Sequence, residues 1–141
     1  MSEIVYARET GLTVDDYVAV VADSALGPTR PLGDRERIAR MLDGANFIVT
    51  AREDGVCIGL ARCMTDFSWA CYCAELAVSN SHQGRGIGTE IIRTCTTLLG
   101  DDVAFNLFST PWSVSYYESL GPKLGFKQPH AAFYIPRKRG V

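Results

Sequence analysis

The chain has 141 residues, of which 47% are hydrophobic and 21% charged, and its formal net charge is −2. These values are typical of one soluble globular domain and argue against a disordered or fibrous protein. Acidic and basic residues are interspersed, and no apolar run approaches the roughly 20 residues of a membrane span, so we expect neither nucleic-acid nor membrane binding. We therefore expect a single domain over residues 1–141.

The first half of the chain has the pattern of a strand, two helices and three more strands. Thr13 and Asp16 resemble a capping box before apolar residues at helical spacing, and Asp34 and Gly44 suit the two ends of a second helix. Short polar turns between the last three segments predict an antiparallel meander. The expected elements are a strand at 4–8, helices from 14 to about 27 and from 34 to 44, and strands at 47–51, 56–64 and 69–78.

The second half begins with a polar, glycine-rich loop at 79–88. The patterns that follow predict a helix at 89–99, a strand at 103–108, a helix at 113–120 that ends at Gly121-Pro122, and closing strands at Phe126 and 131–135. This order of elements is that of a mixed α/β domain.

The five cysteines contain no Cys-x-x-Cys pair, and the chain has only two histidines. This combination gives little support to a disulfide framework or a zinc site, so we expect no metal. Cys71 and Cys73 are two residues apart and are expected on one face of a strand. Reduced, buried thiols and an N-terminus without a secretory pattern predict a cytoplasmic protein.

The most informative segment runs from Glu75 to Glu90, where a strand leads through a glycine loop into a helix. The first backbone N–H groups of a helix lack intrahelical partners, and together with the helix dipole they form a site for a phosphate. The glycines of Gly84-Arg85-Gly86-Ile87-Gly88 let an anion approach the backbone, and Arg85 adds a positive charge. A Walker loop is excluded because no Gly-Lys-Ser/Thr triplet is present, and the dinucleotide pattern G-x-G-x-x-G is not matched.

Gln83 to Gly88 resembles the Gln/Arg-x-x-Gly-x-Gly/Ala signature of the GCN5-related N-acetyltransferase (GNAT) superfamily. Glu75 to Val78 looks like the family's fourth strand, and the order of elements is similar along nearly the whole chain. The resemblance implies a twisted, mostly antiparallel sheet of six to seven strands with about four helices, splayed between the fourth and fifth strands.

The resemblance also implies acetyl-CoA as co-substrate. Its pyrophosphate would bind backbone amides of the glycine loop, its pantetheine arm would pair with the fourth strand, and residues after the fifth strand would add contacts. The implied cofactor-binding residues are Leu76, Ala77, Val78, Gln83, Gly84, Arg85, Gly86, Ile87, Gly88, Thr89, Thr110, Ser113 and Tyr117.

The segment 113–121 is similar to the family's A-x-x-F-Y-x-x-x-G-F stretch, in which a tyrosine protonates the leaving thiolate. Tyr117 occupies that position, and a packing role for both neighbouring tyrosines is the alternative. Pro122 stands where the family has Phe, and Gly125-Phe126 follows four residues later. Either a turn is inserted, or the register differs and Tyr116 is the acid.

The attacking amine must lose a proton, and Glu75 is the first candidate acceptor, directly or through water. Strand alternation places Glu75 opposite Leu76 unless a bulge intervenes, and a strand-edge salt bridge is the alternative role. His82 is expected to be a solvated loop histidine, and His130 is left without a role. The other candidate bases are Asp66 and Tyr72.

The sequence thus predicts an acetyl-CoA-dependent N-acetyltransferase that transfers acetyl to a primary amine by direct attack in a ternary complex. The alternatives are a non-catalytic acyl-CoA-binding sensor or interaction module and, more weakly, a nucleotide-binding protein. The acceptor, a small amine or a protein amine, would meet the loop at 26–33 together with Asp66, Phe67, Trp69 and Trp112, although both tryptophans could instead fill the core. A homodimer is also expected.

Overall fold

The computed structural model describes residues 2–128 and 131–140. The chain forms two compact units, Met1–Leu107 and Phe108–Val141. None of the helices in the described ranges is long and apolar enough to cross a membrane.

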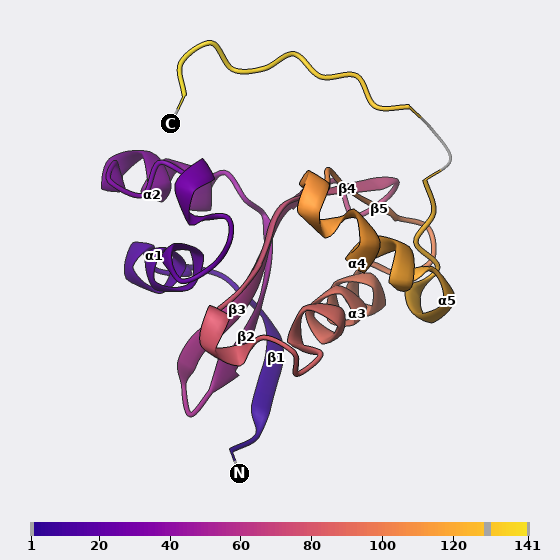
Figure 1. Ribbon diagram of the computed structural model, residues 1–141, viewed down its shortest axis with the longest axis horizontal. Helices are drawn as coiled ribbons and strands as arrows, with labels where there is room; N and C mark the ends of the chain where they lie inside the picture. Colours follow the sequence, from indigo (N-terminus) through magenta and orange to yellow (C-terminus); the bar gives the residue numbers. More distant parts are fainter. Residues whose placement is uncertain (1, 129–130, 141) are drawn as a thin grey trace. The chain divides into compact units, whose positions relative to one another are not determined.

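The first unit is built on one five-stranded sheet in the order β1-β2-β3-β4-β5 (Figure 1). The first four strands pair antiparallel, and the fifth pairs parallel to β4. The strands are β1 (Ile4–Glu9), β2 (Phe47–Glu53), β3 (Val56–Thr65), β4 (Ala70–Val78) and β5 (Ala104–Leu107).

Helices cover both faces of this sheet. On one face lie α1 (Val14–Ala22) and α2 (Arg35–Asp43), joined by a loop that contains the 3₁₀ turn η1 (Gly27–Thr29), and on the other face lies α3 (Ile87–Leu99) (Figure 1). The predicted caps are confirmed, since the Thr13 side chain accepts from the Asp16 N–H and Asp34 caps α2. Helix α1 ends five residues before the predicted position, where the Asp23 carbonyl accepts a hydrogen bond from the Asn80 N–H.

Gly59 of β3 lets α3 pack closely on the sheet. A Cβ atom at this position would lie 2.9 Å from Ile91 Cδ1 and 3.3 Å from the Ala77 carbonyl oxygen. A side chain here would therefore push α3 away from β3 and β4.

A β-bulge interrupts the pairing of β3 with β4. Arg62 faces Glu75, but the next residue, Cys63, faces Cys73, so the register skips Ala74. Before the bulge, Cys73 packs in the core under α3; after it, Leu76 packs against that core while Glu75 points to the α1 side. The predicted placement of Glu75 and Leu76 on opposite faces is thus realised next to a bulge.

Strands β4 and β5 pair only at the start of β4, where 70–73 face 104–107. The second half of β4, residues 74–78, continues beyond the end of this pairing. The pairing thus ends at the part of β4 where the sequence predicts the splay between the fourth and fifth strands.

The second unit contains the 3₁₀ turn η3 (Pro111–Ser113) and two short helices, α4 (Val114–Ser119) and α5 (Gly121–Leu124). The closing strands predicted at Phe126 and 131–135 are wrong, because these residues have no regular secondary structure and Phe133 is 92% exposed. Alternating side chains form a strand only where another strand supplies hydrogen bonds, and the described part of this unit holds none. The sheet accordingly has five strands instead of six or seven.

All five cysteines are free and buried, as expected from the sequence, and both Cys71 and Cys73 point to the α3 side. Burial raises the pKa of Cys57 to about 11. Contact with Cys63 and burial likewise raise the pKa of Cys71 and Cys73. The described residues contain no group of three or more His, Cys, Asp or Glu arranged to hold a metal ion.

Candidate active site

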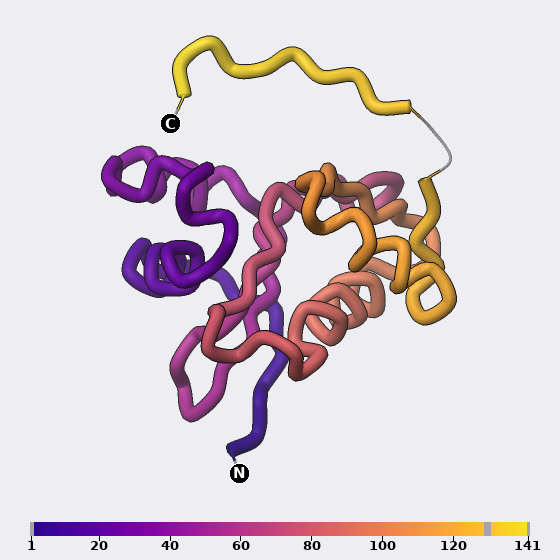
Figure 2. Tube along the Cα trace, viewed as in Figure 1, coloured from indigo at the N-terminus to yellow at the C-terminus, as the bar shows by residue number. Residues whose placement is uncertain are grey.

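The predicted anion-binding loop connects β4 to α3 through the 3₁₀ turn η2 (Asn80–His82), a path that Figure 2 shows as a trace. Gly84 has φ +76° and Gly86 has φ +74°, left-handed values that glycine adopts without strain. Gly86 is the N-cap of α3, and because it has no side chain it makes no side-chain cap to the N–H groups of the first helical turn. These donors and the helix dipole point to the position where an anion would bind.

Side chains hold this loop against the sheet. Gln83 Nε2 donates to the Val78 carbonyl at 2.8 Å, and Glu53 of β2 binds both His82 Nε2, at 3.1 Å, and Arg85 Nη2, at 3.0 Å. The hydrogen bonds from Arg85 and His82 lower the pKa of the Glu53 carboxyl. The expectation that His82 is a solvated loop histidine is wrong, because its side chain is tied to Glu53 and is only 21% exposed.

Arg85 pairs with Glu53 but remains accessible, since its side chain is 43% exposed. Its guanidinium has five N–H donors, so it can bind Glu53 and an anion at the same time. The neighbouring edge of β4, Leu76 to Val78, lies beyond the pairing with β5. The loop amides and this strand segment are therefore adjacent along the chain and both belong to the first unit.

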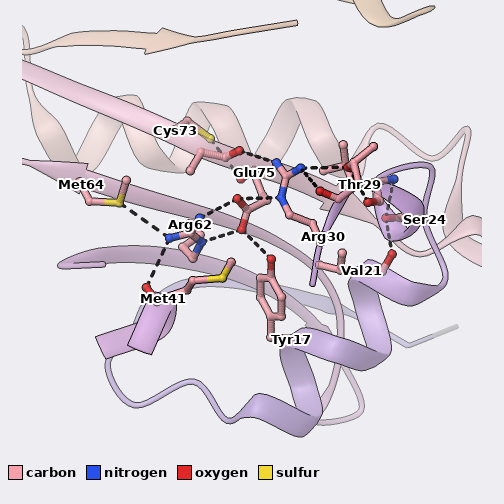
Figure 3. A network of polar contacts seen from close by, with 12 residues as sticks. Tyr17, Val21, Ser24, Thr29, Arg30, Met41, Arg62, Met64, Cys73 and Glu75 are labelled. Carbon is pink, nitrogen blue, oxygen red and sulfur yellow. Dashed lines mark hydrogen bonds and ion pairs between the residues drawn. The ribbon is translucent and has the colours of Figure 1, made fainter. Parts of the chain in front are cut away.

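Glu75 is the centre of a buried polar cluster (Figure 3). Tyr17 Oη donates to Oε1 at 2.8 Å, Arg62 donates through Nε and Nη2 at 2.6 and 2.7 Å, and Arg30 Nε lies 3.1 Å from Oε2. Burial alone would raise the pKa of Glu75, but the hydrogen bonds and charges of Arg62 and the charge of Arg30 outweigh it, so the pKa is lowered. Burial and then the Glu75 charge raise the pKa of Tyr17, which stays a neutral donor.

This cluster contains two arginines and one carboxylate, so it carries a net positive charge. Glu75 is ionised at neutral pH, as a proton acceptor must be, but its lowered pKa makes it a weak base. Glu75 was predicted from the sequence as a site residue, whereas its partners Tyr17, Arg30 and Arg62 were not. Arg62 could have been found, because it is the one charged residue in the otherwise apolar stretch from Cys57 to Met64.

The other predicted residues of the first unit lie near the β3–β4 hairpin. Asp66 Oδ1 accepts three backbone N–H bonds, from residues 68, 69 and 70, which shape the turn and lower the pKa of this carboxyl. Trp69 is 78% exposed, so it does not fill the core. A shallow pocket with a volume of about 470 Å³ lies beside the hairpin, lined by Met64, Asp66, Tyr72 and four other residues.

In the second unit, Thr110 Oγ1 donates to Ser113 Oγ at 3.0 Å at the start of η3. The Tyr117 ring packs edge-on against Phe126 and Tyr116, with ring centroids 5.6 and 5.1 Å apart. Trp112 is 61% exposed and does not fill the core.

A short helical turn lies between Tyr117 and Gly125. Helix α5 begins at Gly121, after α4, and ends at Leu124, with Gly125 as its C-cap at φ +80°. This turn is the kind of feature that the first explanation of the displaced Gly125-Phe126 expects, and the choice between Tyr116 and Tyr117 stays a prediction. His130 lies outside the described residues.

The fold and the loop define a mixed α/β protein in which strand β4 leads through a glycine loop into the N-terminus of helix α3. The sequence model of the Acetyltransferase (GNAT) family matches residues 15–121. The chain therefore belongs to this family, and the predicted resemblance is confirmed. No curated protein matches the chain significantly.

Solved structures share the fold over nearly the whole chain. A candidate acetyltransferase from Deinococcus radiodurans R1 is 28% identical, with a TM-score of 0.71 over 96% of this chain and 93% of that one. The GNAT family acetyltransferase SP0256 from Streptococcus pneumoniae TIGR4 is 20% identical, with a TM-score of 0.70 over 96% and 100%. The aminoglycoside N-acetyltransferase AAC(6')-Iy, solved in complex with CoA, is 17% identical, with a TM-score of 0.68 over 99% and 97%.

Proposed function

We propose that the protein is an acetyl-CoA-dependent N-acetyltransferase that transfers the acetyl group to a primary amine in a ternary complex. The observation that carries this proposal is the N-terminus of α3, which has no side-chain cap and follows two left-handed glycines at the end of strand β4. Family membership supports it, since an acyl-CoA and an amine are the substrates the resemblance implies. We further propose that residues 1–141 work as one catalytic domain.

In this proposal the backbone amides from Gly84 to Thr89 and the Arg85 guanidinium bind the pyrophosphate of acetyl-CoA, while the Gln83 N–H already donates to the Asn80 carbonyl. The pantetheine arm pairs with the edge of β4 at Leu76, Ala77 and Val78, as an added strand would. A backbone N–H of this edge polarises the thioester carbonyl and stabilises the oxyanion. Thr110 and Ser113 add contacts to the cofactor.

The neutral amine attacks the thioester carbon, and the tetrahedral intermediate collapses with cleavage of the carbon–sulfur bond. Tyr117 donates its phenolic proton to the departing thiolate, which leaves as CoA thiol. The nitrogen gives up its proton to Glu75, directly or through water. The route through water is favoured by the contacts of Glu75, because Tyr17, Arg62 and Arg30 occupy its oxygens and lower its pKa.

The acceptor is a small amine or a protein amine, and we propose that the enzyme works in the cytoplasm, with a homodimer as its assembly. Because one structural neighbour is named as an aminoglycoside acetyltransferase, an aminoglycoside belongs in the first panel of acceptors. A polyamine, an amino acid, an arylalkylamine and a lysine peptide complete this panel.

The test is release of free thiol from acetyl-CoA in the presence of each amine, together with calorimetric titration of CoA. Turnover with at least one amine is expected. CoA binding without turnover on any amine would indicate the sensor module instead, and absence of CoA binding would refute both readings. Competition by ADP or NAD against CoA would separate out a nucleotide-binding protein.

The variants Tyr117→Phe and Tyr116→Phe show which tyrosine is the general acid that protonates the thiolate. We expect Tyr117→Phe to lower kcat by about 10²- to 10⁴-fold, the usual contribution of a positioned general acid, and Tyr116→Phe to leave it within a few-fold. The opposite result would assign the proton to Tyr116, and no effect from either variant would remove the phenol from the mechanism.

A further inference from the structure

The side chain of Arg30 connects the loop between α1 and α2 to the bulge of β4. Its Nη2 donates to the carbonyl oxygen of Ala74 at 3.0 Å, and its Nε lies 3.1 Å from Glu75 Oε2 (Figure 3). The same guanidinium thus binds the backbone of the residue that the register skips and the side chain of the next residue.

The guanidinium is itself held from the other side. Arg30 Nη1 donates to Thr29 Oγ1 at 2.9 Å, and Thr29 Oγ1 donates to the Leu26 carbonyl at 2.7 Å within the turn η1. The Arg30 side chain is only 22% exposed. A planar group fixed in this way offers donors in two set directions, which a lysine ammonium cannot reproduce.

The bulge determines which side chains in the second half of β4 face α1 and which face α3. In a regular strand that paired Ala74 and had no bulge, Glu75 would share the face of Cys73 and point to the α3 side, and Leu76 would point to the α1 side. A bulge leaves one residue outside the regular pairing, so contacts from outside the strand are needed to fix its geometry. Arg62 holds Glu75 from the opposite strand, and Arg30 holds both Glu75 and Ala74.

We propose that Arg30 is a positioning residue for acetyl transfer, which locks the β4 bulge and so aligns the N–H groups of Leu76 to Val78. This inference rests on the proposed function, in which that strand edge binds and polarises the thioester. Arg30 touches no reacting atom; it acts through Ala74 and Glu75.

The test compares Arg30→Lys, which keeps the charge but loses the fork, with Arg35→Lys as a matched control. Arg35 also forms an ion pair, with Asp15, but its side chain is 57% exposed and lies away from β4, at the start of α2. We expect Arg30→Lys to lower kcat by about ten- to a hundredfold, as for a small misplacement of the reacting groups, and Arg35→Lys to leave it unchanged. The acetyl-CoA KM should rise by a smaller factor than kcat falls, because the pyrophosphate loop, which Arg30 does not touch, keeps its contacts.

Amide hydrogen exchange provides a readout that does not depend on turnover. In Arg30→Lys, exchange should accelerate at residues 74–78 and stay unchanged at the other strands, whereas a general loss of stability would accelerate exchange throughout the sheet. Equal kcat and equal exchange in the two lysine variants would overturn the proposal, as would a loss confined to the melting temperature.

The two proposals fail in different ways. If the wild-type protein transfers acetyl to no amine, the proposed function fails, and exchange at residues 74–78 alone then decides whether Arg30 locks the bulge. If the wild-type protein is active and Arg30→Lys matches Arg35→Lys, only the positioning role fails. Arg30→Met removes every hydrogen-bond donor of the side chain. It should lower kcat further than Arg30→Lys does and accelerate exchange at residues 74–78 further. If Arg30→Met does not fold, the comparison of Arg30→Lys with Arg35→Lys decides whether the positioning role holds.

Discussion

Replacing Glu75 by Gln removes the single negative charge from the buried cluster and leaves two arginines facing each other. The carboxylate is 3% exposed and accepts from Tyr17, Arg62 and Arg30. Removing one partner of a buried ion pair costs about 3–5 kcal/mol, because the remaining charge is neither paired nor hydrated. We expect Glu75→Gln to lower the free energy of unfolding by this amount.

The size of the expected thermal shift follows from the chain length. Unfolding entropy is about 2.1 cal/mol/K per residue, so 141 residues give about 0.3 kcal/mol/K. A loss of 3–5 kcal/mol then lowers the melting temperature by about 10–17 °C. Glu3→Gln, at an exposed position near the start of the chain, is the matched control and should shift it by no more than about 2 °C.

The pH dependence of the free energy of unfolding gives a second, independent test of the contribution of Glu75. The pKa of Glu75 is lowered in the folded protein from its ordinary value of 4.5, so the unfolded chain binds the proton at a higher pH than the folded chain does. The stabilisation is therefore complete above about pH 4.5 and is lost as the pH falls through the lowered folded value. As the pH falls through this range, the free energy of unfolding measured with urea should decrease more steeply for the wild type than for Glu75→Gln.

Circular dichroism is the appropriate probe for these experiments, because both tryptophans are already exposed in the folded chain and their fluorescence would report little. A Glu75→Gln variant with unchanged stability at pH 7 and an unchanged slope below pH 4.5 would refute the reasoning. It would mean that the cluster contributes no net stabilisation.

Three further outcomes are expected. Gly59→Ala should lower the free energy of unfolding by about 1–3 kcal/mol through overpacking against Ile91. The control Gly33→Ala, with nothing near its Cβ position, should lower it by under about 1 kcal/mol. Equal losses in the two variants would contradict the close approach of α3. Gly86→Ala should raise the Kd for CoA by about five- to thirtyfold, since a left-handed alanine costs about 1–2 kcal/mol at the N-cap of α3, and an unchanged Kd would place the cofactor elsewhere. An aromatic disulfide reagent at pH 8 should label the native protein slowly and all five thiols after denaturation, because all five thiols are buried in the folded chain. Rapid labelling of the native protein would contradict this burial.

The sequence was sufficient wherever local chemistry decides structure. The side chains of Thr13 and Asp34 cap helices, and Gly84 and Gly86 adopt the left-handed conformation that a tight loop before a helix requires. The alternation in β2 to β4 predicted the meander because each strand pairs with its neighbour in the chain. Family membership followed from the same loop, which is a local motif.

The sequence was insufficient where the outcome depends on residues far apart in the chain. Alternation at 131–135 predicted a strand, but a strand also needs a partner, and its pattern does not say whether one is present. Glu75 was recognised as a candidate base, yet its partners Tyr17 and Arg30 lie 58 and 45 positions away, on a helix and in a loop. The contacts that lower its pKa arise only when α1 and its following loop pack on the sheet.

Two backbone features position the proposed site: the absence of a side chain at Gly59 and the unpaired register position of Ala74. Gly59 lacks a side chain, so α3 lies close to β3 and its uncapped N-terminus remains next to the end of β4. Ala74 lacks a partner position in the register, so β4 changes face and Leu76 to Val78 run on beyond the pairing with β5. The first feature positions the donors for a phosphate and the second positions the strand edge for an amide-containing arm. Because the two are set by different residues, Gly86→Ala should act mainly on CoA binding, whereas Arg30→Lys should lower turnover more than affinity.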